Sequence, residues 1–265
     1  MYKFINTKGE HLHELDGKPL IGTSTVLNVL GKTLTWWAAE LSAVECLEAG
    51  EHIPTIRAEY LEAVNSEDKK KAIDALCKKY PTFKKARFAH FDKKNKAADA
   101  GTDMHEELEK YIKSCIETNS GIPLAHSVGE IVQVSIFVDW ALANIKRFIV
   151  SEGYCYSTRL WVGGIVDVLA ELKDGQIGII DFKSSKDVYF SQFLQCSGYA
   201  IEISENGLFD KEGNELYKLE KPISFFAVFP FGAKKVEPQF NYDVEAVKKG
   251  FESCVQLYKL INKLN

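Results

Sequence analysis

The spacing of apolar residues predicts a helical first half that follows a short β-hairpin. An Asp16-Gly17 pair between two short alternating runs favours a tight turn, so residues 11–22 are expected to form the hairpin. Apolar positions three or four residues apart predict helices in the following segments: 23–30, 36–49, 59–96 with a break at Pro81, 102–118 and 127–151. The segment 59–96 is rich in charge, which indicates an accessory element.

The second half changes to short runs rich in β-branched and aromatic residues. Bounded by glycine pairs and Asp-Gly, these runs predict strands at 154–162, 164–172, 176–183 and 223–229. Helices are expected at 188–203 and from Asp243 onward. Strands and helices in this order predict an α/β fold, a central mixed sheet flanked by helices. We expect this core to span residues 101–265 in one compact unit, and residues 1–100 to hold the hairpin and a helical, partly basic accessory region.

Length and composition are those of an ordinary soluble protein. The chain has 265 residues, 46% hydrophobic and 26% charged, and no run approaches the roughly 18 apolar residues of a membrane span. The N-terminal residues lack the apolar run of a signal peptide. The six cysteines are scattered without a Cys-x-x-Cys pair, so neither a zinc ribbon nor an iron–sulfur cluster is expected. These features predict reduced thiols, a cytoplasmic location and no membrane partner.

The net charge of −4 hides a strongly basic segment. From Lys69 to Lys96 there are eleven basic and two acidic residues, a net charge of +9, which leaves −13 for the rest of the chain. Lysines that contact phosphates, with aromatic rings that stack on bases, are typical of surfaces that bind single-stranded nucleic acid. The candidate DNA-binding residues are Lys84, Lys85, Arg87, Phe88, Phe91, Lys93 and Lys94. A solvated helix pair whose aromatic rings face a core would give the same pattern, and both interpretations stay open.

Two carboxylates and a lysine lie on neighbouring apolar runs, Asp167 on the first and Asp181 and Lys183 on the second. A three-residue turn at 173–175, ending in Gly175, would set Asp167 directly opposite Asp181. Since side chains alternate along a strand, Lys183 would share their face. A two-residue turn would place the aspartates on opposite faces, so the prediction depends on the register.

Two like charges opposite each other repel unless a cation lies between them. Carboxylate and carbonyl oxygens suit Mg²⁺ or Mn²⁺, so Asp167, Asp181 and the backbone carbonyl of Phe182 are candidate ligands. Lys183 would then orient a water or stabilise negative charge in a transition state. The structural alternative is an Asp–Lys salt bridge with the second aspartate in solvent.

The order of these residues resembles the PD-(D/E)XK nuclease superfamily, in particular its RecB-type exonuclease branch. Gly101-Thr102-Asp103-Met104-His105 resembles the Gly-x-x-x-His helix of that branch, and Gln195-Cys196-Ser197-Gly198-Tyr199 resembles its Gln-x-x-x-Tyr helix. With Asp167 and Asp181-Phe182-Lys183 between them, the motifs occur in family order. Val166 replaces the usual proline before the first aspartate. The N-terminal part is loosely similar to phage and mitochondrial genome maintenance exonucleases.

The resemblance implies a restriction-endonuclease-like core and a metal-dependent DNA exonuclease that acts in recombination, repair or phage DNA processing. It implies that His105, Asp167, Asp181 and the Phe182 carbonyl bind Mg²⁺ or Mn²⁺ and that Lys183 is catalytic, without an iron–sulfur cluster. The expected partners are DNA, single-stranded or with free ends, and a recombination or single-strand-binding protein, in a bacterial or phage-infected cell.

Three further residues have supporting roles in this interpretation. Gln195 and Tyr199 would support the site or contact the substrate, although Tyr199 could merely bury its ring. Glu109, one helical turn from His105, would either orient its ring or lie in solvent. Two other functions stay open for the whole chain: a nucleic-acid-binding protein that keeps the fold without cleaving, and a structure- or site-specific endonuclease.

Overall fold

The computed structural model of the chain forms two compact units, residues 1–31 with 101–265 and residues 32–100. The structure describes the following residues: 2–7, 10–31, 42, 45–46, 53–125 and 131–264. Side chains are described within these ranges except at 6–7, 10–11, 53 and 90–102.

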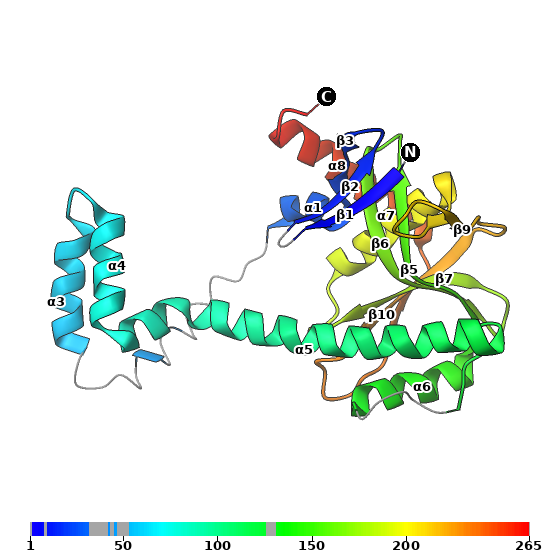
Figure 1. Cartoon of the computed structure of the whole chain (residues 1–265), viewed down its shortest axis with the longest axis horizontal. Coiled ribbons are helices and arrows are strands. Elements are labelled where there is room, and N and C mark those ends of the chain that lie inside the picture. The colour runs from blue at the N-terminus through cyan, green and yellow to red at the C-terminus, as the bar shows by residue number, and fades with distance from the viewer. Residues whose placement is uncertain are drawn as a thin grey trace. The chain divides into compact units, whose positions relative to one another are not determined.

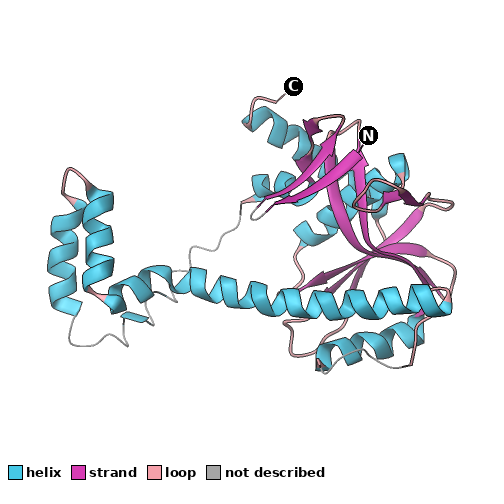
Figure 2. Cartoon of the chain, in the orientation of Figure 1, coloured by secondary structure: helices cyan, strands magenta, loops and turns pink. Residues whose placement is uncertain are grey.

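An eight-stranded sheet forms the centre of the first unit (Figures 1 and 2). The strand order is β11-β10-β7-β6-β5-β8-β9, and β4 pairs with β6 outside this path. The strands are β4 (Ile21–Gly22), β5 (Ile145–Ser157), β6 (Val162–Leu172), β7 (Ile177–Lys183), β8 (Leu208–Phe209), β9 (Glu215–Tyr217), β10 (Ile223–Pro230) and β11 (Gln239–Asn241). β10 runs parallel to β7 and β4 parallel to β6, whereas the other pairs are antiparallel. The predicted mixed sheet is therefore confirmed.

Helices cover both faces of this sheet (Figure 1). On one face, α7 (Phe190–Asn206) and α8 (Val244–Ile261) bury apolar residues against the strands, and on the other the C-terminal part of α5 (Pro81–Asn119) and α6 (Val132–Asn144) do so. The flanked sheet agrees with the predicted α/β class. No helix in the described part of the chain is long and apolar enough to cross a bilayer.

The N-terminal segment forms a small three-stranded sheet, β1 (Tyr2–Thr7), β2 (Glu10–Leu15) and β3 (Lys18–Pro19). Asp16 and Gly17 both have positive φ, 51° and 77°, as a tight turn of this kind requires, so the predicted hairpin is confirmed. A short helix, α1 (Thr23–Val26), and a 3₁₀ turn (Leu27–Leu30) follow.

The N-terminal segment belongs to the first unit, so the predicted division at residue 100 differs from the structure in the first 31 residues. Tyr2, Leu15 and Leu20 form an apolar cluster against Tyr154 and other aromatic residues of the sheet. This packing ties the hairpin to the core. Because it joins residues more than a hundred positions apart, no local pattern in the sequence predicts it.

The second unit contains α3 (Ile53–Val64), α4 (Lys69–Lys79) and the first residues of α5. A small core joins the helices: Ala63, Ile73, Leu76 and Cys77 are buried, and Tyr80, Phe83 and Phe88 pack against them. The helix α4 ends at Lys79 and α5 begins at Pro81, because proline fits the first turn of a helix but not its interior.

Several predicted elements differ from the observed ones. The helix expected at 127–151 is wrong from Ile145 onward, because β5 begins there and β-branched and aromatic residues favour the strand. The helix expected at 102–118 is the end of the continuous α5, since a glycine at 101 costs only about 1 kcal/mol. Most of the helix expected at 36–49 lies outside the described residues.

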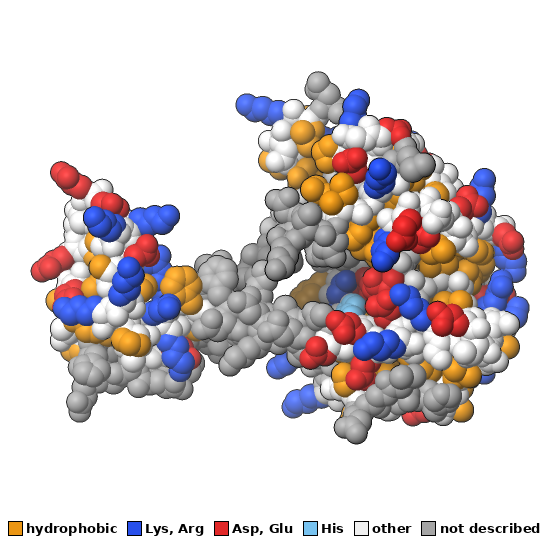
Figure 3. All heavy atoms as spheres, in the orientation of Figure 1, with side chains coloured by type: hydrophobic (Ala, Val, Ile, Leu, Met, Phe, Trp, Pro, Cys, Tyr) orange, Lys and Arg blue, Asp and Glu red, His pale blue; other side chains and the backbone are white. Residues whose placement is uncertain are grey.

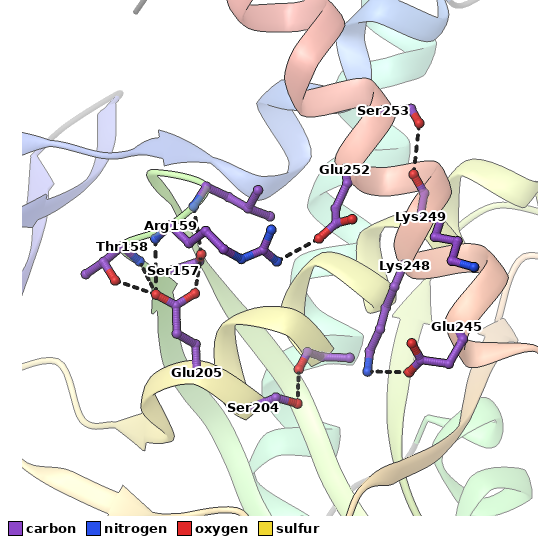
Figure 4. Close-up of polar contacts among 12 residues, drawn as sticks. Ser157, Thr158, Arg159, Ser204, Glu205, Glu245, Lys248, Lys249, Glu252 and Ser253 are labelled. Atoms are coloured by element: carbon purple, nitrogen blue, oxygen red, sulfur yellow. Dashed lines mark hydrogen bonds and ion pairs between the residues drawn. The ribbon is translucent and has the colours of Figure 1, made fainter.

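Glu205 at the end of α7 fixes the turn between β5 and β6 (Figure 4). Its carboxylate accepts hydrogen bonds from the Ser157 hydroxyl at 2.6 Å, from the backbone N–H groups of Thr158 and Arg159, and from the Thr158 hydroxyl. The Arg159 guanidinium also pairs with Glu252 of α8 at 2.6 Å. These hydrogen bonds outweigh desolvation and hold the pKa of Glu205 below its ordinary value.

Glu202, one turn earlier on α7, is fully buried and joins three elements. The Thr23 hydroxyl of α1 donates a hydrogen bond to it at 2.5 Å, and the Cys155 thiol of β5 donates another at 3.1 Å. Burial raises the pKa of Glu202 to about 8, so the carboxyl is protonated over most of the physiological range.

Glu202 should make the free energy of unfolding depend on pH. Because its folded-state pKa is about 8 and its ordinary value is 4.5, its stabilising contribution is complete below about pH 4.5 and is lost as the pH rises through 8. We expect Glu202→Gln, which mimics the protonated carboxyl, to flatten the fall of the thermal midpoint between about pH 5 and 8.

Glu205→Gln is the matched control for this measurement, one helical turn away. Its lowered pKa gives a contribution of opposite sign, present above the ordinary pKa of 4.5 and lost as the pH falls below it. An unchanged pH profile of the thermal midpoint in Glu202→Gln would contradict this assignment.

Candidate metal and phosphodiester site

The turn between β6 and β7 sets the register of the proposed site. Leu172 and Gln176 flank a three-residue loop, with the Leu172 N–H donating to the Gln176 carbonyl at 2.8 Å, and Gly175 has φ of 86°. That left-handed conformation favours glycine. The pairs Val168↔Ile180 and Leu169↔Ile179 confirm the predicted register as far as Val168 and Ile180, where the β6–β7 pairing ends before the two aspartates.

The two strands separate where the carboxylates lie. The last β6–β7 pair is Val168↔Ile180, and the next positions along the two strands are Asp167 and Asp181. The Asp167 carboxylate still reaches β7, because its Oδ2 accepts a hydrogen bond from the Phe182 backbone N–H at 2.8 Å. Both aspartates therefore lie directly beyond the end of the β6–β7 pairing.

Strand β6 is irregular at Asp167. Val166 packs in the core under α7 and α8, whereas Val168 packs in the core under α5 and α6. Residues two positions apart share a face of a regular strand, so the alternation breaks between them. The alternation of side chains between the two faces of the sheet therefore shifts by one residue at Asp167.

Asp181 and Lys183 form an ion pair on β7. The Lys183 Nζ lies 2.6 Å from the Asp181 Oδ2, and the Asp181 side chain is only 1% exposed. Burial raises the pKa of Asp181 and the Asp167 charge adds to this, while Lys183 opposes both; the resulting pKa is above the ordinary value. For Lys183, burial lowers the pKa, but the two aspartates outweigh it and the pKa is raised.

His105 of α5 lies beside this pair of strands. Its Nδ1 is 4.0 Å from the Asp167 Oδ2, and its ring meets the edge of the Phe182 ring at a centroid distance of 5.9 Å. The helix therefore brings the predicted histidine to the first aspartate. Glu109, one turn further on, pairs with Lys113, and the described hydrogen bonds do not join it to His105.

The residues of the Gln-x-x-x-Tyr run lie on α7, on the face of the sheet opposite to α5. The Gln195 side-chain amide donates to the Tyr199 hydroxyl at 2.6 Å, and Tyr199 is 5% exposed. Burial raises the pKa of Tyr199, with Asp181 the largest charge effect. A Cβ at Gly164 would collide with the Tyr199 ring, so only glycine lets this ring pack against β6.

Glu152 belongs to the same neighbourhood and was not predicted. The pairs Ser151↔Val168 and Gly153↔Val166 place it opposite Asp167 on β5. Its φ of 56° is rare for a residue with a side chain and costs of order 1–3 kcal/mol. Burial, followed by Asp167 and Glu109, raises the pKa of Glu152 to about 7.

The donor set can be tested against a divalent cation. Two atoms that bind one ion at about 2.1 Å are at most about 4.2 Å apart, and the His105 and Asp167 atoms, 4.0 Å apart, meet this limit. Asp181 forms an ion pair with Lys183 and no contact with His105 is described for it. Its buried Oδ2 makes no hydrogen bond of good geometry. Within the described part of the chain, no three His, Cys, Asp or Glu side chains are grouped around one point.

A hollow of about 380 Å³ lies along β6, and His105, Asp167, Asp181 and Lys183 are not among the described residues that line it. Ile165, two residues before Asp167, lines it together with Gly163 and Gly164 of β6. Thr23, Ser24 and Thr25 of α1 contribute hydroxyl groups to the lining. The remaining lining residues are His13, Gly22 and Tyr199.

The predicted DNA-binding residues lie in the second unit and at the start of α5, where lysines are spread over the surface together with acidic side chains (Figure 3). Lys84, Lys85 and Arg87 are exposed, and Lys85 pairs with Glu45 at 2.7 Å. Phe88 is half-buried and packs on the small core. The side chains of two further predicted lysines and one ring lie outside those that the structure describes: Phe91, Lys93 and Lys94.

Comparison of the sequence with protein-family models and with curated proteins finds no match. The family resemblance indicated by the motifs therefore stays a prediction. Support for a function comes from the geometry around Asp167, Asp181 and Lys183.

The raised pKa of Glu152 gives a testable consequence. Because burial, followed by the charges of Asp167 and Glu109, raises the pKa of Glu152 to about 7, its stabilising contribution is present at low pH and is lost as the pH rises through 7. We expect Glu152→Gln to raise the thermal midpoint at about pH 8 in EDTA, and to reduce the further rise that Mg²⁺ causes.

The control for this variant is Glu106→Gln on the exposed face of α5, whose pair with Lys110 at 4.0 Å contributes little. Equal thermal midpoints of Glu152→Gln and the wild type at pH 8 would show that Glu152 does not feel the neighbouring charges.

Proposed function

We propose that this chain is a metal-dependent deoxyribonuclease of the PD-(D/E)XK type, and that it acts as an exonuclease. The observation that carries the proposal is the buried Asp181–Lys183 pair at the point where β6 and β7 separate, beside Asp167 and His105. A buried ion pair contributes little net stability, so a role in chemistry is a better explanation for it than packing.

Each residue has a definite task in this proposal. His105, Asp167, Asp181 and the Phe182 carbonyl would hold Mg²⁺ or Mn²⁺, which supplies charge stabilisation and an activated water when bound. Lys183, kept protonated by its raised pKa, would donate a hydrogen bond to the attacked phosphate and stabilise the added negative charge. The Gln195–Tyr199 hydrogen bond would hold Tyr199 against β6, which keeps that wall of the hollow fixed.

The substrate would be DNA, single-stranded or with free ends. The hollow beside Ile165 would take the strand next to the scissile bond, because its glycines and hydroxyl side chains permit close approach of a backbone. The basic segment of the second unit would attract the strand while the acidic remainder of the chain repels it. Recombination, repair or phage DNA processing in a bacterial or phage-infected cytoplasm is the setting we propose, with a recombination or single-strand-binding protein as partner.

Replacement of the lysine tests the proposed chemistry. We expect Lys183→Ala to lower the rate of cleavage by at least about 10²-fold, as the loss of one transition-state donor commonly does. The fold should persist, because Asp181 already has a raised pKa and can take up a proton. Lys183→Arg should not restore activity, since a planar guanidinium cannot replace a compact ammonium.

The assay uses end-labelled linear and circular DNA, single- and double-stranded, with Mg²⁺, Mn²⁺ or EDTA. Lys173→Ala, at the far end of the same hairpin, is the control. Cleavage by Lys183→Ala within a few-fold of wild type would contradict the assigned role. Binding of DNA without cleavage by the wild type under any metal would favour the non-cleaving alternative, and cleavage of circles would favour an endonuclease.

The basic segment gives a separate prediction. Replacement of Lys84, Lys85, Lys93 and Lys94 by Gln should weaken DNA binding and reduce the slope of log affinity against log salt by up to about one for each phosphate that the protein no longer neutralises. The matched control replaces the same number of exposed lysines in the first unit: Lys211, Lys218, Lys221 and Lys234. A slope that changes equally in both variants, or in neither, would show that the segment is merely solvated.

A further inference from the structure

The second unit holds a cavity that the proposed cleavage site does not use. Its volume is about 220 Å³, and it lies between two helices. Each helix contributes two adjacent side chains and a third about one turn further on. The lining residues are Ile56, Arg57 and Tyr60 of α3 and Thr82, Phe83 and Ala86 of α5. All of these described lining residues belong to the second unit, residues 32–100.

The walls of this cavity are apolar and aromatic. Ile56 and Ala86 are buried at its base, and the rings of Tyr60 and Phe83 lie 5.8 Å apart at an angle of 53°. Tyr60 is 39% exposed, so its ring is accessible from outside.

The surroundings of the cavity are rich in basic residues, two of which form ion pairs, Lys79 with Glu59 and Lys85 with Glu45, both at 2.7 Å. From Lys69 to Arg87 the sequence contains eight basic residues and one acidic residue. Arg57 lines the cavity itself and is exposed, and Lys84 and Lys85 follow Phe83 directly. An aromatic, apolar cavity surrounded by cations is complementary to a flat ring carried on a chain of anions.

We propose that this cavity takes a nucleobase of a single-stranded nucleic acid. The base stacks against Tyr60 and Phe83, and Arg57 with Lys84 contacts the adjoining phosphates. The inference rests on the proposed function only in that the ligand is a nucleic acid. It moves the base contact from Phe88 to Phe83: both rings pack on the small core, but only Phe83 is among the described residues that line the cavity.

Cys46 provides a direct reporter, because it also lines the cavity. It is exposed, whereas the other five cysteines are buried. The rate of its alkylation by N-ethylmaleimide can be followed by mass spectrometry on the full chain, in EDTA so that metal-dependent cleavage is suppressed. The probes are an oligothymidylate and an abasic oligonucleotide with the same number of phosphates, each at a concentration that saturates binding.

We expect oligothymidylate to slow the alkylation of Cys46 about tenfold or more, and the abasic oligonucleotide less than twofold. Ala86→Leu, which fills the cavity, should weaken binding of oligothymidylate about tenfold without changing its salt dependence. Ala75→Leu adds the same group at an exposed position of α4 and should leave the affinity unchanged. Tyr60→Ala, at an exposed position, tests the same contact without overpacking.

Equal protection by both oligonucleotides, protection by neither, or full affinity in Ala86→Leu and Tyr60→Ala would overturn the proposal. Its outcome is separate from that of the proposed function. Base-dependent protection of Cys46 in a protein that never cleaves DNA would support the cavity and refute the nuclease, whereas cleavage without such protection would do the reverse.

Discussion

The proposed site depends on the ion pair between Asp181 and Lys183. The strand β7 pairs with β10 through Asp181 and Lys183, whereas its pairing with β6 ends at Ile180, so the sheet holds the backbone of both residues on the β10 side. An ionised carboxylate at 1% exposure is costly in such a place, and the ammonium 2.6 Å away offsets that cost. Asp167 nearby adds a second negative charge at the end of the β6–β7 ladder. A cation between these aspartates would complete the neutralisation that one lysine begins.

The rest of the first unit holds this pair of strands in position. α7 fixes the β5–β6 turn through Glu205 and the N-terminal segment through Glu202, and it presents Tyr199 to the glycine at 164. α5 brings His105 from the opposite face of the sheet. The buried contacts of α7 are mostly neutral or hydrogen-bonded, so the uncompensated negative charge collects at the sheet opening. The strained backbone of Glu152 lies opposite Asp167 on β5.

The sequence predicts the pairing of β6 with β7 at this site better than the contribution of the neighbouring strand β5. The register follows from one local feature, the glycine at the end of a three-residue turn, and the structure confirms it. Glu152 was missed because its pairing depends on β5, and the apolar pattern around residues 145–151 fits a helix as well as a strand. The accessory region was harder to predict for a related reason. A ring among lysines can face a core or a ligand, and only the packing of α3 against α4 distinguishes Phe88 from Tyr60.

The claim that a divalent cation binds between the strands is tested most directly by crystals grown with Mn²⁺ and anomalous diffraction. The account predicts one strong peak within about 2.0–2.3 Å of carboxylate oxygens of Asp167 and Asp181 and close to His105. Asp181→Asn with Asp167→Asn should abolish this peak in crystals of the same form. No peak at millimolar Mn²⁺, with Asp181 still paired to Lys183, would contradict the account and leave the ion pair as a structural feature of the sheet.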